Sequence, residues 1–275
     1  MQLDKIKKHW ENWSKTFETD LKATTKTSTI KKLEIDALYR AIKKTSLHKK
    51  KNVNVLEVGC GNGHNCFALS ELLPNFHFCG MDYVPDMVKH AQAIQKRNAK
   101  RYSKITFCVG DALQLKNNTD IKKQYDIIFT DRCLINLNSE KLQFKAMDQL
   151  LKKLKPKGYL IILENFMQTY ARQNDCRVAV GLPKRKPADY NLFFDENAMI
   201  SRIKKSAKLL HIDDFGSLHD IALYVLVPMM NEGKTDYDHP LVQAATELSL
   251  SLSEKYESPF GAFGQNRLFL FQRRH

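Results

Sequence analysis

The chain has 275 residues and a mass of 31.8 kDa, enough for one sizeable α/β core or two small ones, and its hydrophobic content of 43% is ordinary for a globular protein. No stretch has the length and apolarity of a signal peptide or a transmembrane helix, so we expect a cytoplasmic protein without membrane insertion. The formal net charge of +14 raises nucleic acid as a partner, but the lysines are spread along the chain, as on a solvated surface.

The six cysteines lie at scattered positions, without a CxxC pair and without histidines at metal-ligand spacing. Most of them fall in apolar segments typical of strands and helices. We therefore expect reduced thiols in the core and no metal site.

The first 51 residues differ from the rest of the chain. "HWENWSKTF" and "IKKLEIDALYRAIKK" carry helical periodicity on either side of a polar joint, "TTKTST". We expect two helices that form a cap over residues 1–51 and pack on the main domain rather than fold alone.

Residues 52–275 are expected to form the main domain, in which strand-like and helix-like segments alternate, as in a doubly wound α/β sheet. The strand-like segments are 53–58, 76–82, 105–111, 125–131, 158–165, 221–229 and 267–273. The helix-like segments are 64–73, 85–97, 139–153, about 195–209, and 239–256. This pattern predicts a seven-stranded sheet with an insertion at about 166–195, after the fifth strand.

A glycine-rich turn follows the first strand, in the stretch "VLEVGCGNGHN". Glycine has no Cβ and tolerates positive φ, so Gly59, Gly61 and Gly63 allow a ligand to approach the backbone closely. Their spacing differs from the dinucleotide fingerprint G-x-G-x-x-G. Glu57, just ahead of the turn, would repel a pyrophosphate but suits a ligand with an ammonium or sulfonium centre.

Two more acidic residues follow later strands. Asp82 closes the second strand, where a carboxylate can accept hydrogen bonds from both hydroxyls of a ribose, and Tyr83 beside it offers a flat face to a base. Asp111 and the backbone of Ala112, in "VGDA", lie where the edge of an adenine would be. The pattern predicts a site for adenosine with a cationic amino-acid tail, in preference to a nicotinamide or flavin.

At these motifs the chain resembles class I S-adenosylmethionine-dependent methyltransferases. The resemblance rests on "LEVGCGNG", "GMDYVPDMVKHA", "VGDALQL", "YDIIFTD" and "LKPKGYLIILEN" and covers roughly residues 50–170. It implies a Rossmann-like fold, S-adenosylmethionine as the cofactor and S-adenosylhomocysteine as the product. It also implies that Glu57, Gly59, Gly61 and Gly63 surround the methionine part, that Asp82 holds the ribose, and that Asp111 and Ala112 read the adenine. The joint would bring Lys26, Thr27 or Thr29 to the carboxylate of the donor, or else be an exposed linker.

The acceptor is expected after the fourth strand, at "TDRCLINL", which lacks the Asn/Asp-Pro-Pro-aromatic run of enzymes that methylate amino groups of DNA bases. Arg132 and Asn136 are candidates for binding an anionic acceptor, although Arg132 could instead pair with Asp131 or Glu164. The insertion adds a basic and aromatic lid suited to phosphate: Arg172, Arg177, Lys184, Arg185 and Lys186 with Tyr170, Tyr190 and Asn191.

The catalytic chemistry depends on the methylated atom. A phosphate or carboxylate oxygen is already ionised and needs no base, whereas a sugar hydroxyl needs one, for which His219 and Glu164 are the candidates; with Arg132 they form the predicted catalytic set. "DRCLINL" and "NLFFDE" are similar to methyltransferases found with bacterial surface-polysaccharide genes, including those linked to capsular O-methyl phosphoramidate. This similarity implies O-methylation of a small anionic acceptor, such as a phosphorylated metabolite, a phosphoramidate or a nucleotide-linked sugar. An RNA-modifying enzyme and a non-catalytic S-adenosylmethionine-binding protein are the alternatives.

Overall fold

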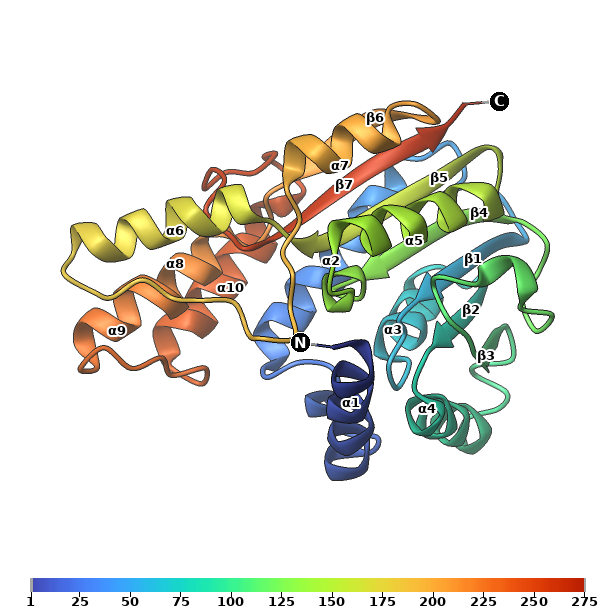
Figure 1. The fold of residues 1–275 in the computed structure, drawn as a ribbon, viewed down its shortest axis with the longest axis horizontal. Coiled ribbons are helices and arrows are strands. Elements are labelled where there is room, and N and C mark those ends of the chain that lie inside the picture. Colours follow the sequence, from blue (N-terminus) through green and yellow to red (C-terminus); the bar gives the residue numbers. More distant parts are fainter. Residues whose placement is uncertain (1, 275) are drawn as a thin grey trace.

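A computed structural model describes residues 2–274, in which a central sheet is covered by helices on both faces (Figure 1). The sheet has seven strands in the order β3-β2-β1-β4-β5-β7-β6. Strands β1 to β5 pair in parallel, and β7 runs antiparallel to both β5 and β6. The strands are β1 (Val53–Val58), β2 (Phe76–Asp82), β3 (Ile105–Val109), β4 (Tyr125–Asp131), β5 (Leu154–Asn165), β6 (Ala207–Asp213) and β7 (Asn266–Arg273). The seven-stranded Rossmann-like sheet predicted from the sequence is confirmed.

The crossover helices begin at the expected residues. They are α3 (His64–Leu72), α4 (Pro85–Arg97), α5 (Glu140–Lys153) and α7 (Glu196–Ile203). Pro85 occupies the first turn of α4, where no backbone N–H is needed. The side chain of Ser139 accepts a hydrogen bond from the Leu142 amide at the start of α5, and Asp195 accepts one from the Ala198 amide at the start of α7.

The sixth strand was predicted at the wrong place. Residues 221–229 are helical and belong to a continuous run made of α8 (Ser217–Ile221), η4 (Ala222–Leu226) and α9 (Val227–Met230). The strand is β6, which begins within the helix predicted at about 195–209 and extends beyond it. An uninterrupted apolar run does not distinguish a buried strand from a buried helix. Here Leu223 and Val227 pack against Val242 of α10 (Pro240–Ser253), whereas β6 is a partly exposed edge strand.

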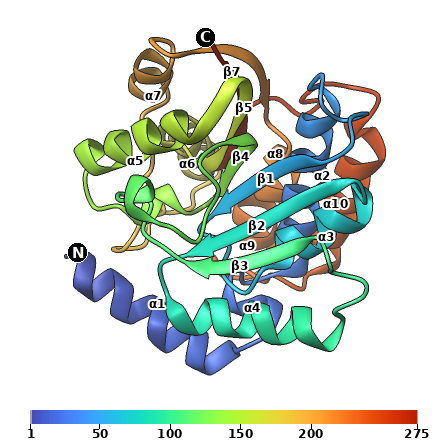
Figure 2. The same cartoon turned by 90° about the vertical axis from the view of Figure 1, so that its right-hand side faces the viewer.

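The two N-terminal helices pack in different ways. Helix α2 (Ser28–Lys43) contributes Leu33, Leu38 and Ile42 to the main core on one face of the sheet. Helix α1 (Leu3–Phe17) lies beside α4 (Figure 2), where Trp10 and Phe17 pack on a small separate cluster that includes Met87. The short helix η1 (Leu21–Ala23) joins them.

The insertion after β5 contains α6 (Met167–Ala179) and an extended loop that leads to α7. The loop returns across the strand ends, because the Leu192 amide donates to the Ile135 carbonyl within η3 (Leu134–Asn136). The remaining short helix, η2 (Leu115–Asn117), follows β3. Within residues 2–274, none of the helices combines the length and the apolar character needed to cross a membrane.

Candidate active site

A cavity of about 390 Å³ lies at the carboxyl ends of the parallel strands. Its floor includes residues from four strand ends, Val58, Asp82, Asp131 and Asn165, and from the start of β7, Asn266. Helix α1, the loop before α2, the insertion and the α8–η4 segment supply the rest of its wall. The cavity therefore combines the positions that the sequence assigns to donor and acceptor.

The glycine-rich turn forms one end of the cavity. Gly59 and Gly61 line it with positive φ angles of 81° and 53°. A Cβ on Gly59 would lie 2.3 Å from Cys133 Sγ, and a Cβ on Gly61 would lie 2.3 Å from Thr24 Cγ2. Side chains are excluded at both positions by strain and by space. Gly63 lies off the cavity, and a Cβ there would be 2.6 Å from the Phe107 ring.

Asp82 joins the turn to the end of β2. Its Oδ2 accepts a hydrogen bond from the Gly61 amide and its Oδ1 accepts one from the Val84 amide, both at 2.8 Å. Burial raises the pKa of Asp82, and these backbone donors oppose that rise. Each carboxylate oxygen has a second lone pair, so Asp82 can still accept hydrogen bonds from a ligand in the cavity.

Tyr83, Asp111 and Ala112 continue the cavity wall beyond Asp82. Tyr83 is 45% exposed, and the Lys7 ammonium lies over its ring. Asp111 accepts a hydrogen bond from the Leu113 amide at 2.8 Å, which fixes the turn after β3. The cavity wall from the glycine turn to Asp111 fits an adenosine. The Asp82 carboxylate would lie at the ribose, and the Tyr83 ring and the polar groups of Asp111 would lie at the base.

Glu57 does not line the cavity, contrary to the expectation of direct contact with the donor. It is 1% exposed, with Oε1 accepting from Asn65 Nδ2 at 2.8 Å and Oε2 from Cys66 Sγ at 3.0 Å. Asn65 also donates to Asp131 Oδ2 at 2.9 Å. Glu57 thus fixes the start of α3 behind the glycine turn and reaches the cavity only through Asn65 and Asp131.

Burial raises the pKa of Glu57 from 4.5 to about 8, so the folded chain favours its protonated form. A raised carboxyl pKa contributes stability at low pH that is lost as pH rises from the unfolded value through the folded value, here from 4.5 to about 8. We expect Glu57→Gln to remove this loss, so that the variant gains a few kcal/mol relative to the wild type across the window. Urea unfolding at several pH values measures it, with exposed Glu140→Gln as the control. Parallel pH profiles for wild type and Glu57→Gln would contradict the assignment.

Four charged side chains, three of them buried, form the middle of the site. Lys31 of α2 lies 2.7 Å from Asp131 Oδ2 and 2.6 Å from Glu34 Oε2. Arg132 Nε lies 2.7 Å from Glu34 Oε1 and 3.5 Å from Asp131 Oδ1. Despite burial, Lys31 and Arg132 lower the pKa of Asp131, and the two acids raise the pKa of Arg132. The charge of Arg132 is thus matched inside the protein.

The sequence offered Asp131 or Glu164 as the partner of Arg132 and missed Glu34 and Lys31. Glu34 is separated from Arg132 by 98 positions, and it lies on a helix expected to be part of a cap. Its only local signal is the i,i+3 spacing with Lys31, which places two charges on the mostly apolar buried face of the helix.

Glu164 is not placed to act as a base. It is fully buried and absent from the cavity wall, and its carboxylate accepts hydrogen bonds from the amides of Cys133 (3.1 Å), Leu134 (3.0 Å) and Ile135 (3.3 Å). Burial raises its pKa to about 7, and the amide donors oppose that rise. Glu164 holds the turn after β4 in place.

His219 does line the cavity, from α8 rather than from the start of a strand. Its Nδ1 lies 2.9 Å from Asp220 Oδ1, and its Nε2 lies 3.1 Å from the hydroxyl of Thr29. An ionised carboxylate can only accept, so Asp220 fixes the proton on Nδ1 and leaves a lone pair on Nε2. The hydroxyl of Thr29 also lies 2.8 Å from that of Thr27, a cavity residue.

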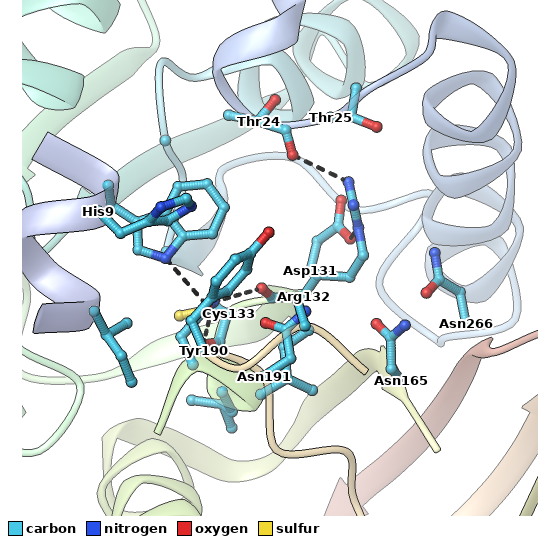
Figure 3. A pocket seen from close by; sticks show the side chains of 18 of the residues that line it. His9, Thr24, Thr25, Asp131, Arg132, Cys133, Asn165, Tyr190, Asn191 and Asn266 are labelled. Carbon is cyan, nitrogen blue, oxygen red and sulfur yellow. Dashed lines mark hydrogen bonds and ion pairs between the residues drawn. The ribbon is translucent and has the colours of Figure 1, made fainter. Parts of the chain in front are cut away.

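The insertion meets helix α1 over the cavity (Figure 3). Tyr190 stacks on His9 at 4.3 Å between ring centroids, and Trp10 Nε1 donates to Asn136 Oδ1 at 3.1 Å. Asn136, Tyr190 and Asn191 all line the cavity. Lys26 lines it as well, with its ammonium 5.7 Å from the centre of the Tyr237 ring.

The two arginines assigned to the acceptor in α6 lie off the cavity. Arg172 is exposed and donates to the Ala262 carbonyl at 3.3 Å, and Arg177 donates to the carbonyls of Pro183 and Tyr224. Arg185 lines the cavity instead, 3.4 Å above the centre of the Tyr224 ring. The sequence could not tell that Arg185 lines the cavity while Arg172 and Arg177 do not. The path of the loop at 180–195 decides this, and helical periodicity does not predict the path of a loop.

The family whose sequence profile matches the chain is described as "Methyltransferase domain", over residues 49–224. Two similar curated proteins are norajmaline N-methyltransferase of Rauvolfia serpentina, 29% identical over 46% of this chain and 38% of its own length, and malonyl-[acyl-carrier protein] O-methyltransferase of Bacillus cereus, 28% identical over 44% and 42%. The matched region thus spans less than half the length of these relatives.

Solved structures with the same fold cover nearly the whole chain. A methyltransferase of Haloferax volcanii, in complex with the Trm112 activator, aligns over 97% of this chain and 98% of its own with a TM-score of 0.62 and 12% identity. The N-methyltransferase NodS of Bradyrhizobium japonicum, with S-adenosyl-L-homocysteine bound, covers 98% and 99% with a TM-score of 0.58 and 15% identity.

The donor side of the cavity agrees with the match to the methyltransferase-domain family. A turn open only to glycine and the carboxylate of Asp82 at the end of β2 fit an S-adenosyl ligand. No cluster of three metal-ligand side chains occurs within residues 2–274. The chain belongs to the methyltransferase-domain family.

Proposed function

We propose that this enzyme methylates a small anionic acceptor, such as a phosphorylated metabolite, a phosphoramidate or a nucleotide-linked sugar, and that the methyl group goes to oxygen. The observation that carries the proposal is Arg185. Its guanidinium lines the cavity and donates to Gln173 Oε1 at 2.5 Å, yet no carboxylate of residues 2–274 lies within ion-pair distance of it. A half-buried cation on a cavity wall without an internal counter-charge favours an anionic ligand.

Arg132, the other arginine on the cavity wall, is less suited than Arg185 to bind an anionic acceptor. Arg132 is paired with Glu34, so an anion near it would meet a group of balanced charge. Arg185 is held flat between neutral side chains, with Gln173 on its edge and Tyr224 beneath its face. This arrangement fixes the direction of the guanidinium while leaving its charge available to a phosphate or carboxylate.

The size of the cavity favours a small acceptor over RNA. A volume of about 390 Å³ is that of a small-molecule site, and α1 and the insertion close over it through the His9–Tyr190 stack. An RNA-modifying enzyme remains the second candidate because of the net charge of +14. It predicts methyl transfer to RNA and an affinity for RNA that falls steeply with salt.

In the proposed reaction, S-adenosylmethionine supplies an electrophilic methyl group. The glycine turn and Asp82 would hold the donor, Lys26 would approach its carboxylate, and Asp111 with Ala112 would hold its adenine. Arg185 would bind the anionic part of the acceptor, with Asn136, Tyr190 and Asn191 around it. A role in capsule or surface-polysaccharide synthesis rests on the resemblance of "DRCLINL" and "NLFFDE" alone.

The curated relatives do not indicate which atom is methylated, since one is an N-methyltransferase and another is an O-methyltransferase. A donor-binding protein without turnover is the third candidate. Incubation with labelled S-adenosylmethionine and separate pools of nucleoside diphosphate derivatives, small carboxylates and total RNA separates the three. We expect label in an anionic small-molecule pool; label only in RNA, or nowhere despite donor binding, would overturn the proposal.

Replacing Arg185 by glutamine is expected to raise KM for the anionic acceptor by about 100-fold, because a charge-assisted hydrogen bond to a ligand is lost. The affinity for S-adenosylmethionine should not change. Arg172→Gln is the matched control, since Arg172 lies in the same insertion but off the cavity. Equal effects of the two substitutions on KM would remove Arg185 from the acceptor site.

A further inference from the structure

At three neighbouring strand ends, a residue on the cavity wall carries a buried oxygen atom that has no hydrogen-bond partner. Asp131 is the last residue of β4, Asn165 the last of β5 and Asn266 the first of β7, and these strands are adjacent in the sheet. All three residues line the cavity, with side chains on one side of it (Figure 3), and are only 8%, 3% and 2% exposed. In each of them Oδ1 has no hydrogen-bond partner.

The surrounding contacts fix which atoms are free. Asn266 Nδ2 donates to Glu34 Oε1 at 3.0 Å, so the Oδ1 of the same amide turns away from Glu34. Asp131 Oδ2 accepts from Lys31 and Asn65, whereas Oδ1 accepts no hydrogen bond and has only the ion pair with Arg132 Nε at 3.5 Å. Asn165 stands directly opposite Asn266 in the β5–β7 ladder. The free atoms of this group, which we name the oxygen triad (Asp131, Asn165 and Asn266), are therefore all acceptors.

A buried acceptor without a donor is unfavourable, so a set of three such atoms in one cavity points to a ligand that supplies the donors. Hydroxyl and amine groups supply them. An ionised phosphate or carboxylate oxygen brings only lone pairs and would face three like partial charges.

Resting on the proposed function, we infer that the oxygen triad binds the nucleophile of the acceptor as a hydroxyl or amine that still carries its proton. The anion of the acceptor then serves as a handle at Arg185, on the insertion, and is not the methylated group. The methylated atom is then not itself an ionised oxygen, an alternative that the sequence leaves open.

A protonated nucleophile must lose its proton as its lone pair forms the bond to carbon. His219 lines the same cavity, and Asp220 leaves its Nε2 as a lone-pair site next to the Thr29 hydroxyl. The nucleophile's proton passes to this nitrogen, directly or through the hydroxyl. A nucleophile that carries a proton therefore needs both the acceptor atoms of the oxygen triad and a base such as His219. An ionised acceptor oxygen would need neither.

The bond made to the methyl group tests the inference on the wild-type enzyme. The probe is S-adenosylmethionine with a ¹³C-labelled methyl group, incubated with the anionic fraction of a small-metabolite extract. We expect a product that retains an unmethylated anionic group. An O-methyl ether would support both the inference and the proposed O-methylation, whereas an N-methyl product would support the inference and overturn the assignment of the methyl group to oxygen. A methyl phosphate ester, seen by coupling of the ¹³C to phosphorus, or a base-labile methyl carboxylate would overturn the inference and leave the proposed function standing. No labelled product at all would overturn both.

Substitutions at Asn165 give a second test with a readout besides activity. Asn165→Leu should lower kcat/KM for the labelled acceptor about tenfold, with unchanged donor affinity, because a partner of the nucleophile is lost. It should also raise Tm by about 2 °C, because an unsatisfied buried amide is removed. The control is Asn65→Leu, at 5% exposure, whose amide bonds to Glu57, Asp131 and Lys31 and whose loss should lower Tm. A lower Tm for Asn165→Leu would give Asn165 a structural role and overturn its place in the triad.

Asn165→Asp separates the two kinds of nucleophile and guards against misfolding of the leucine variant. The new side chain keeps the shape and the acceptor oxygens, so transfer should be retained. The added negative charge should lower KM for an amine acceptor several-fold, because it attracts the amine. It should not lower KM for a hydroxyl acceptor. Transfer as weak as in Asn165→Leu would contradict the triad, because a carboxylate accepts hydrogen bonds as well as an amide does.

Discussion

Replacing Asp82 by alanine is expected to weaken the binding of S-adenosylmethionine by about 100-fold or more. Two effects add. The carboxylate would no longer accept hydrogen bonds from the ribose hydroxyls, and the Gly61 amide would lose the partner that holds the glycine turn against β2. Titration calorimetry of the purified protein measures the loss directly, without knowledge of the acceptor.

The control for this prediction is Asp86→Ala, four residues further along the chain. Asp86 lies in the first turn of α4 with an exposed partner, Lys89, and does not line the cavity. Its removal should leave donor affinity within about twofold. If Asp82→Ala binds the donor as tightly as Asp86→Ala does, the ribose assignment is wrong.

Replacing His219 by alanine is expected to lower kcat by about 100-fold to 10,000-fold, the usual contribution of a general base. Donor affinity should be retained, because His219 lies on α8, whereas the glycine turn and Asp82, which would hold the donor, follow β1 and end β2. The measurement is single-turnover transfer from labelled S-adenosylmethionine to the acceptor pool that the wild type uses.

Two further variants make this result specific. Asp220→Asn should lower kcat less than His219→Ala does, because it disturbs the tautomer and direction of the imidazole and leaves the base in place. His211→Ala should leave kcat unchanged, since His211 lies on the edge strand β6, off the cavity. Unaltered single-turnover rates in His219→Ala would show that no base acts from this position.

The donor half of the fold could be predicted because its signals are local. Each strand that leads to Asp82 or Gly59 is a short apolar run with a turn at its end, and the following helix begins at a proline or at the glycine turn itself. These patterns depend on backbone geometry within about ten residues, which the sequence shows directly.

The acceptor half could not be predicted to the same depth because its contacts join distant segments. Arg132 pairs with Glu34, His219 with Thr29, and Asn165 with Asn266 across the sheet. The misplaced sixth strand had the same origin, since the burial of Leu223 against α10 is a tertiary contact. The sequence predicted Arg132 and a basic group in the insertion near the acceptor. It did not predict that Arg185 and Lys186 line the cavity while Arg172 and Arg177 lie off it.

The central claim is methyl transfer from S-adenosylmethionine to a small anionic molecule. The most direct measurement supplies the purified enzyme with the labelled donor and an unfractionated cell extract, then separates products by size and by anion exchange. We predict that label appears in a small, anionic product, and that Arg185→Gln lowers that signal while Arg172→Gln does not. Label confined to RNA or to an uncharged product would contradict it.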